Sequence, residues 1–174
     1  GGSGSGKSEY AEQTAVQCRN GNGGTLWYLA TMRIWGDEGR KRVERHRRMR
    51  AAQGFETIER YTGLEQLELE ERFEASNSAG LDDEQENESL KRWESCRVAQ
   101  KPVLLLECMS NLVLNEFYAQ ENGAQERILQ GIKHLQKQCR DLIIVTNEIF
   151  SDGMTYDPES ERYIQLLGWI NREL

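Results

Sequence analysis

Long apolar runs are absent from this sequence, and positive charge is in short supply. No run approaches the roughly 18 apolar residues that a membrane-spanning helix needs, and no signal peptide is recognisable. Acidic residues outnumber basic ones by 29 to 22, so the formal net charge is −7. Proteins that bind nucleic acid through its phosphate backbone normally carry a basic surface. We therefore expect a cytoplasmic protein with no membrane span and no general affinity for nucleic acid.

Cysteine and histidine are also sparse and dispersed. The four cysteines, Cys18, Cys96, Cys108 and Cys139, form no C-x-x-C pair, and the chain has only two histidines. Structural metal sites usually take such residues in closely spaced pairs. We expect reduced, mostly buried thiols rather than disulfides or a cysteine–histidine metal site.

The first eight residues match G-x-x-x-x-G-K-[ST], the pattern of a phosphate-binding loop. They are Gly1, Gly2, Ser3, Gly4, Ser5, Gly6, Lys7 and Ser8. In such a loop, backbone N–H groups surround phosphate oxygens, the lysine reaches the β- and γ-phosphates, and the serine hydroxyl binds Mg²⁺. A glycine–serine linker is the competing explanation. Lys7 and Ser8 at the required positions, followed by a helix-forming segment over residues 9–16, favour the phosphate loop.

The rest of the chain alternates between two patterns. Short apolar runs at residues 26–30, 103–106 and 142–146 lack polar alternation, as strands of a parallel sheet covered on both faces do. Helical patterns occupy residues 37–51, 110–119, 125–140 and 158–174. Alternating strands and helices behind a phosphate loop predict one α/β domain over residues 1–174. Its sheet is mainly parallel and flanked by helices, as in a P-loop NTPase of the RecA-like type.

Two parts of that pattern are missing from the sequence. A phosphate loop normally follows a buried strand, and a closing strand is expected after the last helix. Neither is present, so we expect a fold that lacks its first and last strands and has a vacant central strand position with exposed edges.

Residues 65–94 differ in composition from the rest of the chain. They are crowded with aspartate and glutamate and contain the small polar run Ser76-Asn77-Ser78-Ala79-Gly80. We expect a solvated, partly flexible excursion, because so little apolar surface cannot offset the entropy of ordering.

A second group of chemically suggestive residues surrounds His46. The basic neighbours are Arg45, Arg47, Arg48 and Arg50. Taken alone, an arginine run is usually a solvated helix face. Here the chain is otherwise acidic, and several guanidinium groups together suit several phosphate oxygens. Like charges nearby favour the neutral imidazole, which is a nucleophile able to attack the α-phosphorus of a nucleotide.

Seven short motifs follow one another in a distinctive order. They are GG-x-x-SGKS at residues 1–8, Y-L-A-T at 28–31, D-E at 37–38, R-V-x-x-H-R-x-x-R at 42–50, T-x-E at 57–59, L-L-E-C at 105–108 and V-T-N-E at 145–148. Only the phosphate loop is specific by itself, but the order and spacing extend over nearly the whole chain. In these motifs the sequence resembles the bifunctional adenosylcobinamide kinase / adenosylcobinamide-phosphate guanylyltransferase family of cobalamin biosynthesis.

The resemblance implies a two-step enzyme. Such an enzyme phosphorylates adenosylcobinamide with GTP or ATP and then transfers GMP from GTP to the product through a guanylylated histidine. The resemblance implies that this histidine corresponds to His46 and that Ser8 and Glu107 bind Mg²⁺. Family contacts to the nucleotide fall on the phosphate loop and on Ala30, Thr31, Met32, Arg47, Arg48, Met49, Arg50, Glu59 and Glu107.

Glu107 also has support that does not depend on the resemblance. It lies at the end of a predicted buried strand, where P-loop enzymes place a carboxylate that organises Mg²⁺. A cap on the following helix is the alternative role.

The resemblance further implies a homo-oligomer, for which Trp35 and Trp169 are candidate contacts. We also expect the helix that carries His46 to move, because a phosphate loop cradles the β- and γ-phosphates and leaves the α-phosphorus at the edge of the site.

The sequence departs from the family at residues 149–158, where many members carry G-x-G-I-V-P after V-T-N-E. This departure leaves corrinoid specificity open. Two other functions also stay open: a small-molecule P-loop kinase that forms no covalent nucleotide, and a nucleotide-gated binding module without catalysis.

Overall fold

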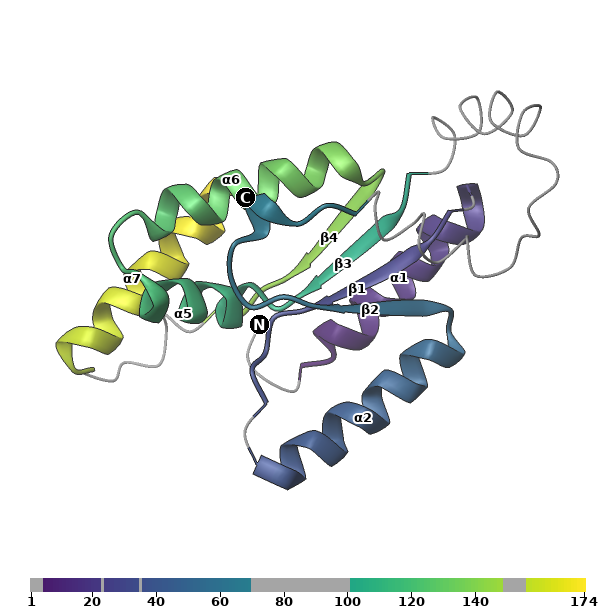
Figure 1. The fold of residues 1–174 in the computed structure, drawn as a ribbon, viewed down its shortest axis with the longest axis horizontal. Coiled ribbons are helices and arrows are strands. Elements are labelled where there is room, and N and C mark those ends of the chain that lie inside the picture. Colours follow the sequence, from purple (N-terminus) through teal and green to yellow (C-terminus); the bar gives the residue numbers. More distant parts are fainter. Residues whose placement is uncertain (1–4, 23, 35, 70–100, 149–155) are drawn as a thin grey trace, which may run out of the picture.

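The chain folds around a four-stranded parallel sheet. The computed structural model describes residues 5–22, 24–34, 36–69, 101–148 and 156–174. The strands are β1 (Leu26–Ala30), β2 (Phe55–Glu59), β3 (Val103–Glu107) and β4 (Asp141–Val145), and their order across the sheet is β2-β1-β3-β4 (Figure 1). All neighbouring pairs are parallel and run in register from end to end.

Helices cover both faces of this sheet. They are α1 (Lys7–Asn22), α2 (Gly36–Ala52), α5 (Met109–Ala119), α6 (Ala124–Gln138) and α7 (Pro158–Glu173), together with the short 3₁₀ helix η1 (Leu64–Gln66). Figure 1 shows α1 and α2 on one side of the sheet and α5, α6 and α7 on the other. Each of α1 and α2 runs from the carboxyl edge of the sheet to its amino edge, since each leads into the start of a parallel strand.

Alternating strand residues build a separate core on each face. On the α1 side the buried residues include Ala11, Ala15, Tyr28, Phe55 and Leu105. On the other side a larger cluster joins the sheet to α5, α6 and α7. Because successive strand residues point to opposite faces, continuous apolar runs such as residues 103–106 can serve both cores at once.

The predicted α/β class is confirmed, and so are most of the predicted elements. The three predicted strands and four predicted helices agree with the structure to within about two residues, which is the usual uncertainty of element ends. Strand β2 was missed. Phe55 and Ile58 are buried while Glu56 and Glu59 are exposed, so this edge strand lacks the apolar run that marks the others.

The expectation of a vacant central strand position is wrong. β3 and β4 pair directly, with Leu104 opposite Leu142 and Glu107 opposite Val145. Direct pairing lets the backbone N–H and C=O groups of both strands form hydrogen bonds, whereas a vacant position would leave those groups without partners.

The expectation of a solvated excursion is wrong for its first residues. Leu67 and Leu69 are buried at 4% and 1% exposure and, with Leu64 just before the segment, belong to the larger core. The Gln138 side chain accepts a hydrogen bond from the Leu69 N–H (2.6 Å) and donates one to the Leu67 carbonyl (2.9 Å). This segment therefore packs against α6, whereas residues 70–94 lie outside the described residues.

The three described cysteines are free thiols, but only one of them is buried. Cys139 is buried, and burial raises its pKa to about 11, so it stays protonated at neutral pH. Cys18 and Cys108 are half-buried, and Cys96 lies outside the described residues. Within the described ranges, no helix has the length and apolarity needed to cross a membrane.

Close packing between α6 and η1 depends on Gly131. A Cβ at this position would lie 2.6 Å from the Leu64 Cβ and 3.2 Å from the Glu65 backbone nitrogen. We expect Gly131→Ala to lower the free energy of unfolding by about 1 to 2 kcal/mol, because the clash outweighs the better helix propensity of alanine. Chemical denaturation measures this effect.

Gly21, in the last turn of α1, provides the matched control. Nothing lies within 4 Å of a Cβ placed there. Gly21→Ala is expected to be neutral or to stabilise the protein by up to about 1 kcal/mol. Equal effects of the two substitutions would contradict the packing explanation.

Candidate active site

The carboxyl edge of the sheet brings together residues that are far apart in the sequence. Ala30 pairs in register with Glu59 on one side and with Glu107 on the other. The three residues therefore form one row across β2, β1 and β3, on the face that α1 covers. All three are among the predicted nucleotide contacts.

The described part of the predicted phosphate loop leads directly into α1. Gly6 has φ of 80°, a conformation that glycine adopts without the strain a side chain would add. The Tyr10 N–H donates to the Gly6 carbonyl (3.0 Å), and the Lys7 ammonium donates to Ser5 Oγ (3.3 Å). The first turn of a helix presents unpaired N–H groups and a positive dipole end, which favours bound anions. Gly1 to Gly4 lie outside the described residues.

Glu107 accepts hydrogen bonds at both carboxylate oxygens. The Ser8 hydroxyl donates to Oε1, and the Tyr28 hydroxyl donates to Oε2 at 3.0 Å. Burial raises the pKa of Tyr28, and the Glu107 charge raises it further, so the phenol remains a donor. The acid at the end of β3 thereby joins the phosphate loop to the middle of β1.

The oxygens of Ser8 and Glu107 suit Mg²⁺. This ion is usually held in nucleotide sites by one or two protein oxygens, with water and substrate phosphates completing its shell. The described residues contain no group of three or more histidine, cysteine, aspartate or glutamate side chains placed to hold a metal. The pair therefore fits a nucleotide-dependent Mg²⁺ site and does not fit a preformed protein cage.

Thr31 connects the ends of β1 and β3. Its N–H donates to the Glu107 carbonyl (3.1 Å), and its hydroxyl both accepts from the Cys108 N–H and donates to the Cys108 carbonyl, each at 2.8 Å. The Asn115 amide donates to the Thr31 carbonyl (2.7 Å). Thr31 is fully buried, whereas its neighbour Met32 is 46% exposed.

Arg50 attaches α2 to the rest of the site. Its guanidinium carbon lies 3.7 Å from the centroid of the Tyr28 ring, and its Nη1 lies 3.8 Å from Glu12 Oε1 on α1. Arg50 is only 7% exposed. Burial raises the pKa of Glu12; the Arg50 charge opposes this shift, and the charges of Glu107 and Glu9 add to it.

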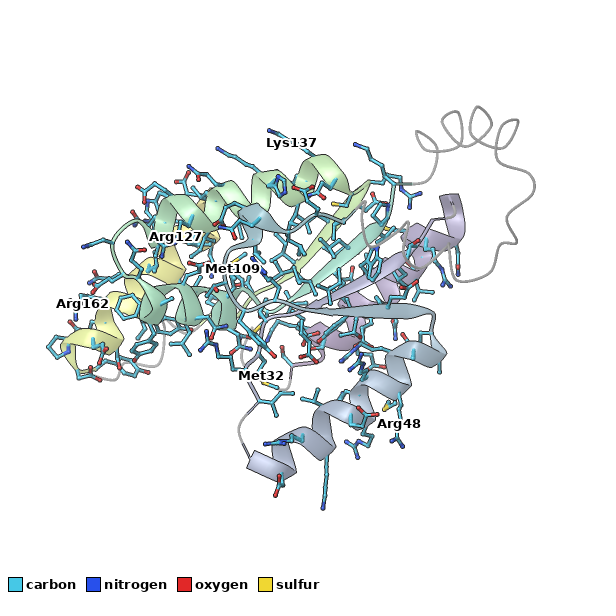
Figure 2. All side chains as sticks on the ribbon, viewed as in Figure 1. Met32, Arg48, Met109, Arg127, Lys137 and Arg162 are labelled. Atoms are coloured by element: carbon cyan, nitrogen blue, oxygen red, sulfur yellow. The ribbon has the colours of Figure 1, made fainter. Side chains whose placement is uncertain are left out.

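The other predicted residues of α2 are exposed. His46, Arg47, Arg48 and Met49 all face solvent, and Arg48 pairs with Glu44 at 3.1 Å. In Figure 2, Arg48 lies on α2, on the same side of the sheet as Met32. The structure thus brings Ser8, Glu107 and the edge of the sheet together, but it leaves the side chains around His46 outside that contact network.

Helix periodicity nevertheless relates His46 to the phosphate loop. His46 precedes Arg50 by four residues in α2, so the two residues lie on the same face of that helix, with His46 about 6 Å nearer the carboxyl edge. Ser8 precedes Glu12 by four residues in α1 and has the same relation to it. The Arg50–Glu12 pair therefore joins the two helices one turn away from both His46 and Ser8.

Tyr28 and Glu12 were not predicted as part of the site. The sequence predicts Tyr28 as a buried strand residue and as the first residue of the Y-L-A-T motif, with no role in the site. The available signal was its hydroxyl, which needs a polar partner in an otherwise apolar strand. Glu12 carries no comparable signal, because a glutamate near the start of a helix is usually solvated.

Comparison with known proteins confirms the resemblance. The family model described as cobinamide kinase / cobinamide phosphate guanyltransferase matches residues 1–83 and 82–174. The chain belongs to this family. It is also 28% identical over 191 residues to the bifunctional adenosylcobalamin biosynthesis protein CobU of Escherichia coli (strain K12), a match that covers 100% of this chain and 86% of that protein. The expectation of a bifunctional transferase is thereby confirmed.

The contribution of Arg50, in contact with Glu12 and Tyr28, to the stability of the fold can be measured. We expect Arg50→Ala to lower the free energy of unfolding by about 2 to 3 kcal/mol near neutral pH, since Glu12 stays partly buried without its partner and the Tyr28 ring loses a cation. Chemical denaturation of the full chain measures the loss.

The pH dependence of the stability lost in Arg50→Ala tests whether Glu12 causes that loss. A carboxyl whose pKa is raised in the folded state destabilises the fold only when it is ionised, so the loss in Arg50→Ala should shrink as the pH falls through the folded pKa of Glu12. An equal loss at about pH 7 and about pH 4 would contradict this explanation. Arg48→Ala, which removes an exposed pair, should change stability by less than about 0.5 kcal/mol.

Proposed function

We propose that this chain phosphorylates adenosylcobinamide and then transfers GMP from GTP to adenosylcobinamide phosphate through a guanylylated His46, giving adenosyl-GDP-cobinamide. The observation that carries the proposal is the Glu107 carboxylate, which meets Ser8 at the start of α1 and Tyr28 in β1. A phosphate loop with an acid at this position is suited to holding a nucleoside triphosphate and its Mg²⁺.

In the kinase step, the loop amides and Lys7 would hold the β- and γ-phosphates. Ser8 and Glu107 would hold Mg²⁺, which when bound neutralises charge on those phosphates. Tyr28 orients the Glu107 carboxylate through its 3.0 Å hydrogen bond. The acceptor oxygen would then form a bond to the γ-phosphorus. The bond from that phosphorus to its bridging oxygen breaks, the nucleoside diphosphate leaves, and the hydroxyl proton passes to solvent.

In the transfer step, the neutral His46 imidazole would attack the α-phosphorus. A P–N bond forms, the bond from the α-phosphorus to its bridging oxygen breaks, and pyrophosphate leaves. An oxygen of cobinamide phosphate next attacks the same phosphorus, so that a P–O bond forms, the P–N bond breaks and the imidazole leaves. Arg47 and Arg48 are exposed on the same helix and would neutralise charge on the phosphoryl oxygens.

Arg50 has a different part in this scheme. It is buried against Tyr28 and Glu12, so in this conformation it holds α2 beside α1. His46 lies one turn beyond this attachment, in the exposed part of α2. We propose that the exposed part of α2 closes on bound GTP, because reacting atoms must approach to about 3 to 3.5 Å.

Labelling with GTP radiolabelled at the α-phosphate tests the covalent step. We expect acid-labile, base-stable label on the wild-type chain and none on His46→Ala. His134→Ala is the matched control, since His134 is the only other histidine and lies on α6 beside Glu68. Label that persists in His46→Ala would refute the proposed intermediate and favour a kinase that forms no covalent nucleotide.

Titration calorimetry with GTP tests the phosphate loop. We expect Lys7→Ala to raise the Kd for GTP by about tenfold to a hundredfold, the effect of losing a charge-assisted contact to phosphate. Lys133→Ala, an exposed lysine on α6, should leave the Kd unchanged. Unchanged binding by Lys7→Ala would refute the assignment of residues 1–8 as a phosphate loop.

A further inference from the structure

We infer that the cavity between the end of β4, the start of α6 and helix α7 binds the corrin macrocycle of the acceptor. This inference rests on the proposed function and locates its second substrate. The cavity has a volume of about 1180 Å³, and its walls include Thr146, Asn147, Trp169 and Asn171. Figure 1 shows α7 crossing the first half of α6, on the side of the sheet opposite α1 and α2.

The position of the cavity suits an acceptor. Thr146 to Glu148 follow β4 directly, so the cavity lies at the carboxyl edge of the sheet, the edge that also carries the phosphate loop. In open α/β sheets, ligands bind outside the carboxyl ends of the strands. An acceptor held here approaches the nucleotide from the opposite face of the sheet.

The size of the cavity suits a macrocycle. Pockets for drug-sized ligands usually measure about 300 to 1,000 Å³, and this cavity exceeds that range. Trp169 supplies flat apolar surface of the kind that packs against a ring system, and the largely buried Phe117 lines the same wall.

The polar groups of the wall match amides rather than phosphates. Five of the lining side chains are carboxamides: Asn122, Gln125, Asn147, Gln165 and Asn171. A carboxamide both donates and accepts hydrogen bonds, so it complements the carboxamide groups on the rim of a corrin ring.

The charges of the wall are nearly balanced. The lining includes two arginines and three glutamates: Arg162, Arg172, Glu121, Glu126 and Glu148. Arg162 pairs with Glu121 at 3.3 Å. Such a wall lacks the excess of cations that a polyphosphate requires. The cavity is therefore distinct in chemistry from the nucleotide site.

Part of the amide wall is held rigid and connected to the nucleotide site. Asn171 donates to the Asn147 carbonyl (3.2 Å) and accepts from the Thr146 hydroxyl (2.7 Å). Asn147 donates to Ser110 Oγ (2.9 Å), which lies 3.0 Å from Cys108 Sγ. Cys108 directly follows Glu107, so a continuous chain of contacts runs from the cavity wall to the carboxylate beside the phosphate loop.

Equilibrium dialysis of the full chain with adenosylcobinamide tests the assignment. The variant Asn122→Ala/Gln165→Ala removes two exposed carboxamides that line the cavity. We expect its Kd, and the KM for adenosylcobinamide in the kinase assay, to rise by about tenfold to thirtyfold with kcat unchanged. Gln130→Ala/Gln136→Ala, which alters exposed positions of α6 outside the cavity, is the matched control and should bind like the wild type.

Each outcome separates this inference from the proposed function. Unchanged corrinoid affinity in Asn122→Ala/Gln165→Ala, with normal activity, would overturn the cavity assignment alone. A higher Kd for GTP, with an unchanged Kd for adenosylcobinamide, would also overturn the cavity assignment, because the cavity would then bind the nucleotide. A wild-type chain that neither binds nor phosphorylates adenosylcobinamide would overturn the proposed function together with the inference.

Discussion

The Glu107 carboxylate is the group on which the rest of the site depends. It accepts hydrogen bonds from Ser8 at the start of α1 and from Tyr28 in β1, so one side chain joins the phosphate loop to the centre of the sheet. The Tyr28 ring in turn carries the Arg50 guanidinium, which brings α2 into the same group of contacts. A half-buried acid at this position needs such donors, because an ionised carboxylate without hydrogen bonds is costly to bury.

In the proposed scheme, one nucleotide site serves two reactions. Transfer of the γ-phosphate requires groups at the start of α1, whereas attack on the α-phosphorus requires a nucleophile at the edge of the site. Helices α1 and α2 run in the same direction and are joined one turn below Ser8 and His46 by the Glu12–Arg50 pair. In the proposed scheme the nucleophile, His46, is exposed, while Arg50 one turn further along the same helix stays attached to α1.

The two faces of the sheet have different physical characters. On the α1 side, Ala11 and Ala15 let the first helix lie close to the strands, which brings the helix start to the carboxyl edge. On the other side, larger apolar residues hold α5, α6 and α7, and the carboxamides at the end of this layer line a large cavity. If the nucleotide and the acceptor bind where we propose, this separation gives each a surface of suitable chemistry.

The sequence by itself determined most of the helices and strands, because buried strands and amphipathic helices each leave a local periodic pattern. The phosphate loop stays a prediction from its glycine-rich pattern. The sequence also carried the order of motifs that indicated the family. The sequence did not predict strand β2, the direct pairing of β3 with β4, or the packing of Leu67 and Leu69. All three depend on partners that are distant in the sequence. Only the tertiary structure decided that Ser8 and Tyr28, 99 and 79 positions from Glu107, meet on one carboxylate, and that Arg50 is buried while His46 is exposed. The physical reason is that local patterns specify which face of an element is buried, whereas hydrogen bonds between elements depend on how the elements pack.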